Sequence, residues 1–71
     1  MNSVAKLVGR NIAEARREAG LSQTQLSERI AICHQDISRM ECGRHCPRVP
    51  TLLRVARGIE VPLPDLLRGI E

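Results

Sequence analysis

The sequence contains no phenylalanine, tyrosine or tryptophan. A hydrophobic core must therefore come from Leu, Ile, Val, Met and Ala, and there is no aromatic side chain on which an unpaired base could stack. This absence argues against a protein that binds single-stranded nucleic acid or RNA by stacking.

A long apolar run is missing as well. The sequence has no stretch of about 18 apolar residues, which a membrane-spanning helix would need. Residues 1–10 contain polar residues where a signal peptide would have its apolar segment. We therefore expect a cytoplasmic protein with no membrane partner.

Cysteines are few, and no two of them form a CxxC pair. The three are Cys33, Cys42 and Cys46, an odd number that fits neither a secreted disulfide framework nor a complete structural zinc site. Catalytic patterns are also missing, because the sequence shows no Ser/His/Asp arrangement, no paired-carboxylate cleft and no phosphate-cradling glycine loop. We expect no enzyme activity, no metal, no cofactor and no small-molecule substrate.

The chain has the composition of an ordinary globular domain. Its 71 residues are 42% hydrophobic and 27% charged, and this length leaves room for one domain, residues 1–71. The formal net charge is +3, and arginine supplies ten of the eleven basic residues. Guanidinium groups suit phosphates and guanine edges, although basicity alone is weak support for nucleic-acid binding.

Apolar residues recur at helical spacing throughout, and glycine or proline interrupts the pattern between segments. The spacing predicts an all-α, compact five-helix bundle, with helices at about residues 4–19, 23–30, 34–42, 50–58 and 64–70. Only Ala31, Ile32 and Cys33 separate the second helix from the third. Two short helices joined by a three-residue turn have helix-turn-helix geometry.

Two motifs identify a family. Residues 20–27 read GLSQTQLS, residues 37–43 read ISRMECG, and Pro47 follows. Over about residues 8–67 the chain resembles the Cro/cI-type repressors, also called the XRE family. The resemblance implies a lambda-repressor-like fold. It also implies a transcriptional regulator, with a repressor as the expected kind, that binds a pseudo-palindromic site on double-stranded DNA as a homodimer.

The third predicted helix is the expected recognition helix. Its inward residues are Ile37 and Met40, so its polar residues should face outward and can enter a major groove. Gln35 can pair with adenine, Arg39 with guanine, and Asp36 can accept from cytosine. The predicted base-reading set is His34, Gln35, Asp36, Ser38 and Arg39.

The resemblance assigns further roles outside that helix. Gln23 beside the Ser22 cap should grip a DNA phosphate at a helix N-terminus, and Ser22 itself either joins this contact or only caps. Arg44 and Arg48 should contact the DNA backbone. The other implied feature is a structural ion pair between Arg16 and Glu41.

Three features lie outside the common family pattern or are left open by it. Ala31 stands where the family usually has glycine, and Cys33 replaces a Ser or Thr cap, which should cost about 1 kcal/mol of helix stability. For the dimer contact we expect the apolar residues of the last predicted helix: Leu63, Leu66, Leu67 and Ile70.

Two alternatives follow from the same residues. The helical bundle could be a protein-interaction or antitoxin-like module that does not read DNA. Alternatively, metal binding or oxidation could switch DNA binding, because soft-ligand side chains gather around the recognition helix; they are Cys33, His34, Cys42, His45 and Cys46.

Overall fold

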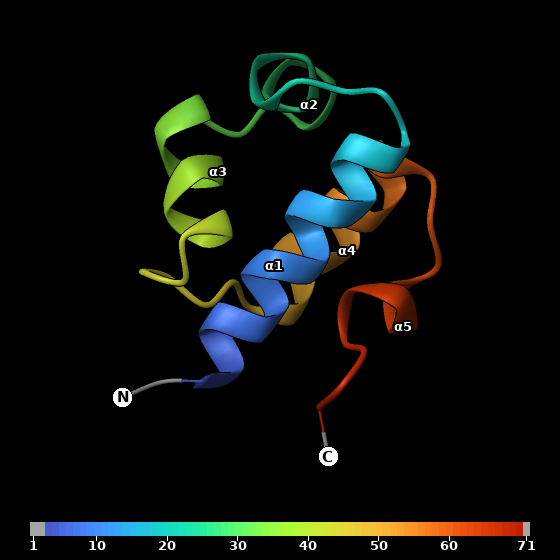
Figure 1. Ribbon diagram of the computed structural model, residues 1–71. Helices are drawn as coiled ribbons and strands as arrows, with labels where there is room; N and C mark the ends of the chain where they lie inside the picture. The colour runs from blue at the N-terminus through green and yellow to red at the C-terminus, as the bar shows by residue number, and fades with distance from the viewer. Residues whose placement is uncertain (1–2, 71) are drawn as a thin grey trace.

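The computed structural model describes residues 3–70. This part of the chain forms five α-helices and no strand (Figure 1). The helices are α1 (Ser3–Glu18), α2 (Gln23–Ile30), α3 (His34–Glu41), α4 (Val49–Ile59) and α5 (Leu63–Leu66). The predicted all-α bundle is confirmed.

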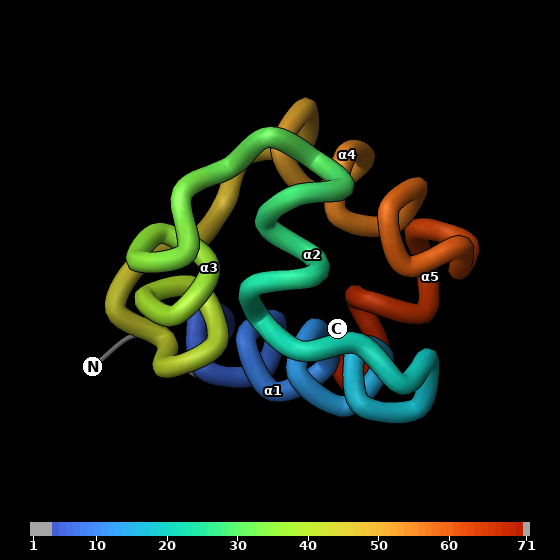
Figure 2. The backbone as a smooth tube through the Cα atoms, turned by 90° about the horizontal axis from the view of Figure 1, so that it is seen from above, coloured from blue at the N-terminus to red at the C-terminus, as the bar shows by residue number. Residues whose placement is uncertain are grey.

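The helices are arranged around α1. It packs against α3 on one side and α5 on the other, while α2 packs on α3 and α4 (Figure 1). Seen from above, α2 crosses over the bundle, with α1 and α4 on opposite sides of it (Figure 2). No helix within residues 3–70 is long and apolar enough to cross a membrane.

All five helices contribute aliphatic side chains to one core. Several are fully buried, and each contributes roughly 1.5–3 kcal/mol by leaving water. The buried set comprises Val8, Ile12, Ala15, Leu26, Ile30, Ile37, Met40, Leu52, Val55, Ala56, Ile59 and Leu66. The core therefore forms without an aromatic residue, as the composition requires.

Close helix packing places α3 against α1. A Cβ added to Gly9 would lie 2.1 Å from the carbonyl oxygen of Met40 and 2.9 Å from that of Glu41. Both distances are shorter than the contacts that Cβ atoms make in proteins, so only glycine allows this approach. Gly9 thereby sets how closely α3 packs on α1.

The last helix is shorter than the sequence predicts. The expected helix at 64–70 is instead one turn, Leu63–Leu66, followed by turns. Asn11 of α1 donates to the carbonyl oxygens of Leu66 (3.1 Å) and Arg68 (3.0 Å). Because a continuing helix would use the Leu66 carbonyl itself, this long-range contact explains where α5 stops.

Candidate nucleic-acid interface

The turn between α2 and α3 occupies Ala31–Cys33, as the spacing predicts. Ala31 has φ of 56°, in the left-handed region, which costs a non-glycine residue about 1–2 kcal/mol. This conformation is the physical reason for glycine at this position in the family. Ser27 supports the turn, since its hydroxyl donates to the carbonyl of Ile32 (2.6 Å).

Capping differs between the two helices that meet at this turn. Ser22 and Gln25 form a capping box at the start of α2: the Ser22 hydroxyl accepts from the Gln25 N–H (3.0 Å), and the Ser22 N–H donates to Gln25 Oε1 (2.8 Å). Cys33 at the start of α3 makes no side-chain cap. The start of α3 therefore depends on packing more than on capping.

The face of α3 directed away from the core is polar. Ile37 and Met40 are buried, which turns the predicted base-reading residues outward. His34, Gln35, Asp36 and Arg39 are exposed, and Ser38 is half-buried. The structure thus brings all five predicted residues together on one short helix.

Two weak contacts between side chains lie on this exposed face of α3. Arg39 pairs with Asp36 at 3.3 Å, and both side chains are more than half exposed. The Cys33 thiol contacts Gln35 Oε1. Exposed pairs of this kind contribute at most about 1 kcal/mol, so the side chains can be redirected toward another partner at small cost.

Arg16 and Glu41 form a buried ion pair between α1 and α3. Arg16 donates from Nε to Glu41 Oε2 (2.7 Å) and from Nη2 to Oε1 (2.9 Å), and the side chains are 10% and 6% exposed. Nη1 donates to the Leu21 carbonyl (2.8 Å). The hydrogen bond with Glu41 raises the pKa of Arg16, while partial burial opposes this effect.

Gln23 also hydrogen-bonds to Glu41 of this ion pair, a contact that the sequence analysis did not predict. Its Nε2 donates to Glu41 Oε1 (2.8 Å), so the side chain expected at a phosphate also links α2 to α3. Nε2 keeps a second hydrogen for another acceptor. The N–H groups of Gln23 and Thr24, in the first turn of α2, have no intrahelical partner, and a helix N-terminus of this kind suits an anion.

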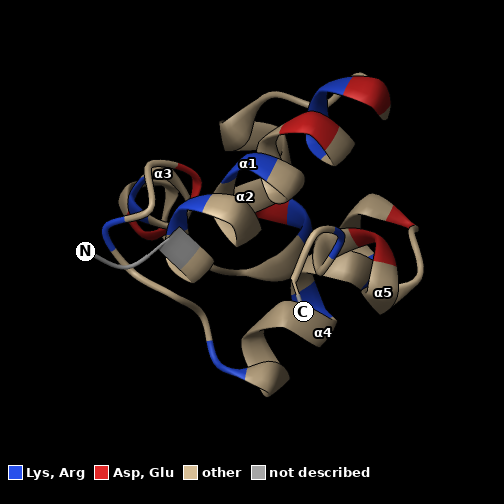
Figure 3. Ribbon diagram, turned by 60° about the horizontal axis from the view of Figure 1, so that its bottom comes forward, with Lys and Arg blue, Asp and Glu red and all other residues tan. Residues whose placement is uncertain are grey.

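Formal charges in α4 and in the connection before it are all positive. Residues 42–59 contain four arginines and no acidic residue. Two of these, Arg44 and Arg48, are exposed and lie in the connecting loop, where Figure 3 shows blue segments along the chain. They follow the C-terminal end of α3.

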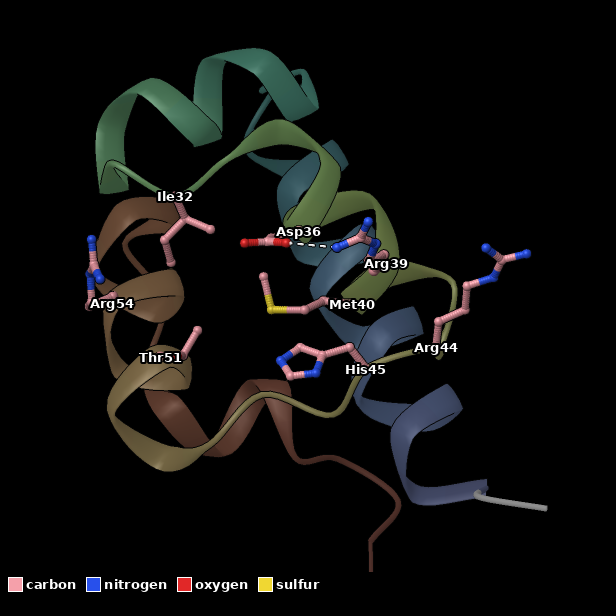
Figure 4. A pocket seen from close by; sticks show the side chains of 8 residues that line it. All are labelled: Ile32, Asp36, Arg39, Met40, Arg44, His45, Thr51 and Arg54. Carbon is pink, nitrogen blue, oxygen red and sulfur yellow. Dashed lines mark hydrogen bonds and ion pairs between the residues drawn. The ribbon is translucent and has the colours of Figure 1, made fainter.

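A cleft of about 510 Å³ separates α3 from α4 (Figure 4). Its lining comes from the turn, α3, the loop and α4: Ile32, Asp36, Arg39, Met40, Arg44, His45, Thr51 and Arg54. The His45 ring and Thr51 side chain point into the cleft, whereas Arg44 points away from it into solvent. The cleft leaves the Asp36 and Arg39 flank of α3 open to a large partner.

The cysteines show no assembled site. Cys33, Cys42 and Cys46 are free and exposed. Among residues 3–70, no group of three or more His, Cys, Asp or Glu side chains could hold a metal ion. The geometry therefore lends no support to a switch built on a metal held by these side chains.

The four residues expected at a dimer contact differ in how far they are exposed. Leu66 is fully buried within one chain, which corrects the expectation that its side chain meets a partner. Leu63 and Leu67 are half-buried and pack on the core, and Ile70 is 37% exposed. The physical reason is that Leu66 is the buried residue of the single turn of α5 and belongs to the core of its own chain.

Comparisons with known proteins agree with the fold. A family model described as a helix-turn-helix domain matches residues 7–68. The chain is 40% identical over 62 residues to the uncharacterized HTH-type transcriptional regulator y4dJ of Sinorhizobium fredii, covering 87% of this chain and 80% of that protein. A second uncharacterized HTH-type transcriptional regulator, from Methanothermobacter thermautotrophicus, is 40% identical over 48 residues, which are 68% of this chain and 70% of the relative.

A solved structure has the same fold. The crystal structure of the restriction-modification controller protein C.AhdI from Aeromonas hydrophila aligns with a TM-score of 0.87, covering 92% of this chain and 98% of that one, at 20% sequence identity. The fold, the turn geometry and the family model lead to one assignment: the chain belongs to the helix-turn-helix domain family.

Proposed function

We propose that this protein is a transcriptional regulator that reads a specific sequence in double-stranded DNA with α3. The observation that carries the proposal is the outward face of α3, where Gln35, Asp36 and Arg39 are exposed on a helix held by the buried Arg16–Glu41 pair. An α-helix is about 10–12 Å across with its side chains, so α3 with its polar outer face fits a major groove about 12 Å wide.

Contacts to the DNA backbone would come from two segments beside α3. One segment is the start of α2, where Ser22, Gln23 and the first-turn amides suit a phosphate. The other is the loop after α3, with the exposed Arg44 and Arg48. Backbone donors from two segments fix the register of a recognition helix without reading sequence.

The size of one chain supports binding as a homodimer. Its largest dimension is 30 Å between Cα atoms, and it has one recognition helix. Successive major grooves on one face of DNA lie about 34 Å apart, so one copy covers only one half-site. A symmetric pair would cover a pseudo-palindromic operator and, where that operator overlaps a promoter, would act as a repressor.

We assign the dimer contact to Ile70 with the half-buried Leu63 and Leu67. Ile70→Glu should dissociate the dimer in analytical ultracentrifugation. Leu53→Glu is the matched control, because Leu53 on α4 has nearly the same exposure, 38% against 37%. If only Leu53→Glu yields monomers, the contact lies on α4 and this assignment is wrong.

Selection from a randomised duplex pool at about 150 mM salt tests the DNA-reading proposal. Wild-type protein should enrich a palindromic site. Gln35→Ala and Arg39→Ala should each relax the sequence at one position per half-site, losing about 1–3 kcal/mol of discrimination.

Arg57→Ala is the control in that selection. It removes one exposed arginine from the C-terminal half of α4 and should leave the selected sequence unchanged. Failure of the wild type to enrich any sequence would reject the proposal in favour of a protein-interaction module. A promoter-reporter fusion carrying the enriched site should then lose expression when the protein is present, as repression requires.

A further inference from the structure

Arg54 of α4 reaches the back of the helix-turn-helix. Its Nη2 donates to the carbonyl oxygen of Ile30 and lies 3.5 Å from the carbonyl oxygen of Ala31. Ile30 is the last residue of α2, and Ala31 is the left-handed residue of the turn. A side chain from outside the motif therefore contacts both residues at which the chain turns toward α3.

A cation at these two carbonyl oxygens stabilises the C-terminal end of α2. The last carbonyls of a helix have no intrahelical donor, and the C-terminal end of the helix dipole attracts positive charge. At this helix end the backbone N–H groups of Ala31 and Ile32 both donate to the Ser27 carbonyl. The Ile30 carbonyl is thus left for Arg54.

A second arginine links the same two helices, with the donor on α2 and the acceptor on α4. Arg29 of α2 donates from Nη1 to the carbonyl of Gly58 near the end of α4 (3.0 Å). A Cβ at Gly58 would lie 2.3 Å from Ile30 Cγ2, so the two helices touch there. Thus α2 and α4 each donate an arginine hydrogen bond to the C-terminal end of the other.

We propose that Arg54 is a positioning residue for DNA recognition. By holding the Ile30 and Ala31 carbonyls it stabilises a turn conformation that an alanine adopts only at a cost, and it thereby sets the angle at which α3 meets the major groove. This inference rests on the proposed DNA-reading function. A competing role exists, because Arg54 also lines the cleft beside α3 and could instead contact a DNA phosphate.

The test compares three variants with the wild type. Two are the single variants Arg54→Met and Arg54→Lys, and the third is the double variant that combines Arg54→Met with Ala31→Gly. Met keeps the apolar stem and removes the donors, and glycine relieves the left-handed strain. Arg57→Met is the matched control, one turn further along α4. For each protein, affinity is measured for the selected operator and for an unrelated duplex over a series of salt concentrations.

Positioning predicts a loss of discrimination between the two duplexes. Arg54→Met should bind the operator at least about tenfold more weakly, the lower limit expected when a hydrogen bond from a charged group is lost, with little change for the unrelated duplex and an unchanged salt slope. Arg54→Lys should be intermediate. Ala31→Gly should restore at least half of the lost discrimination.

Two results would overturn the inference. An equal weakening for both duplexes with a salt slope reduced by about one would make Arg54 a phosphate contact. A lower melting temperature with unchanged discrimination would leave it a purely structural residue.

Hydrogen exchange of the free protein separates this inference from the proposed function. The turn and first-turn amides of Ile32, Asp36 and Ile37, whose hydrogen bonds close the turn and begin α3, should exchange faster in Arg54→Met and recover with Ala31→Gly. If the wild type binds no specific DNA, the proposed function fails, yet this exchange result still supports the hold on the turn. Unchanged exchange would overturn that hold whatever the DNA result.

Discussion

Replacing Glu41 with alanine removes the acceptor of three hydrogen bonds at once. Arg16 loses its bonds from Nε (2.7 Å) and Nη2 (2.9 Å), and Gln23 loses its bond from Nε2 (2.8 Å). The Arg16 side chain is 10% exposed, so its charge is left poorly solvated with the Leu21 carbonyl as its remaining acceptor. Breaking a buried ion pair in this way costs about 3–5 kcal/mol.

That cost is large for a chain of this size. A protein of 71 residues is expected to have about 4–11 kcal/mol of total stability. Each kcal/mol corresponds to about 4–8 °C in melting temperature for a domain this small. Glu41→Ala should therefore melt at least about 12 °C below the wild type, and it should lose much of its folded population at 37 °C.

Urea denaturation followed by far-UV circular dichroism measures the effect. Arg16→Met should cost about as much as Glu41→Ala, whereas Arg16→Met combined with Glu41→Leu should recover most of the loss, because an apolar pair replaces the ion pair. Glu60→Gln is the control, since its 3.9 Å contact with Arg29 is exposed and should contribute less than about 1 kcal/mol.

The reasoning fails if Glu41→Ala costs no more than this control. It also fails if the double variant loses the sum of the losses of Arg16→Met and Glu41→Leu measured singly, because the two side chains would then act independently.

Gly9→Ala should destabilise by about 3 kcal/mol in the same assay, because the added methyl overlaps backbone oxygen atoms of α3; a loss no larger than that of Gly20→Ala, a left-handed position with open space, would contradict this. Asn11→Ala should cost about 1–3 kcal/mol and speed amide exchange at residues 67–70, and protection unchanged there would show that Asn11 does not hold the C-terminal segment. Ala31→Gly should raise stability by about 1 kcal/mol through relief of the left-handed strain, and a lower melting temperature would refute that account.

The sequence by itself determined the helices, the turn and the polar face of α3. Helical spacing of apolar residues and the punctuation by glycine and proline are local signals, and they placed four of the five helices within one residue at each end. Gln35 and Arg39 face outward for the same reason, since Ile37 and Met40 must face the core. The GLSQ and ISRMECG motifs carried the family resemblance.

Tertiary structure decided the contacts between residues far apart in the chain. Asn11 takes a carbonyl that a longer α5 would need, Gln23 donates to the buried Arg16–Glu41 pair, and Arg54 reaches the turn. The sequence held one indication of the Asn11 contact, because Asn11 is a polar residue beside the apolar stripe of α1. It held no indication of the Arg54 contact. Periodicity reports which face of a helix is buried but not which distant atom meets it, so these contacts emerge only when the helices pack.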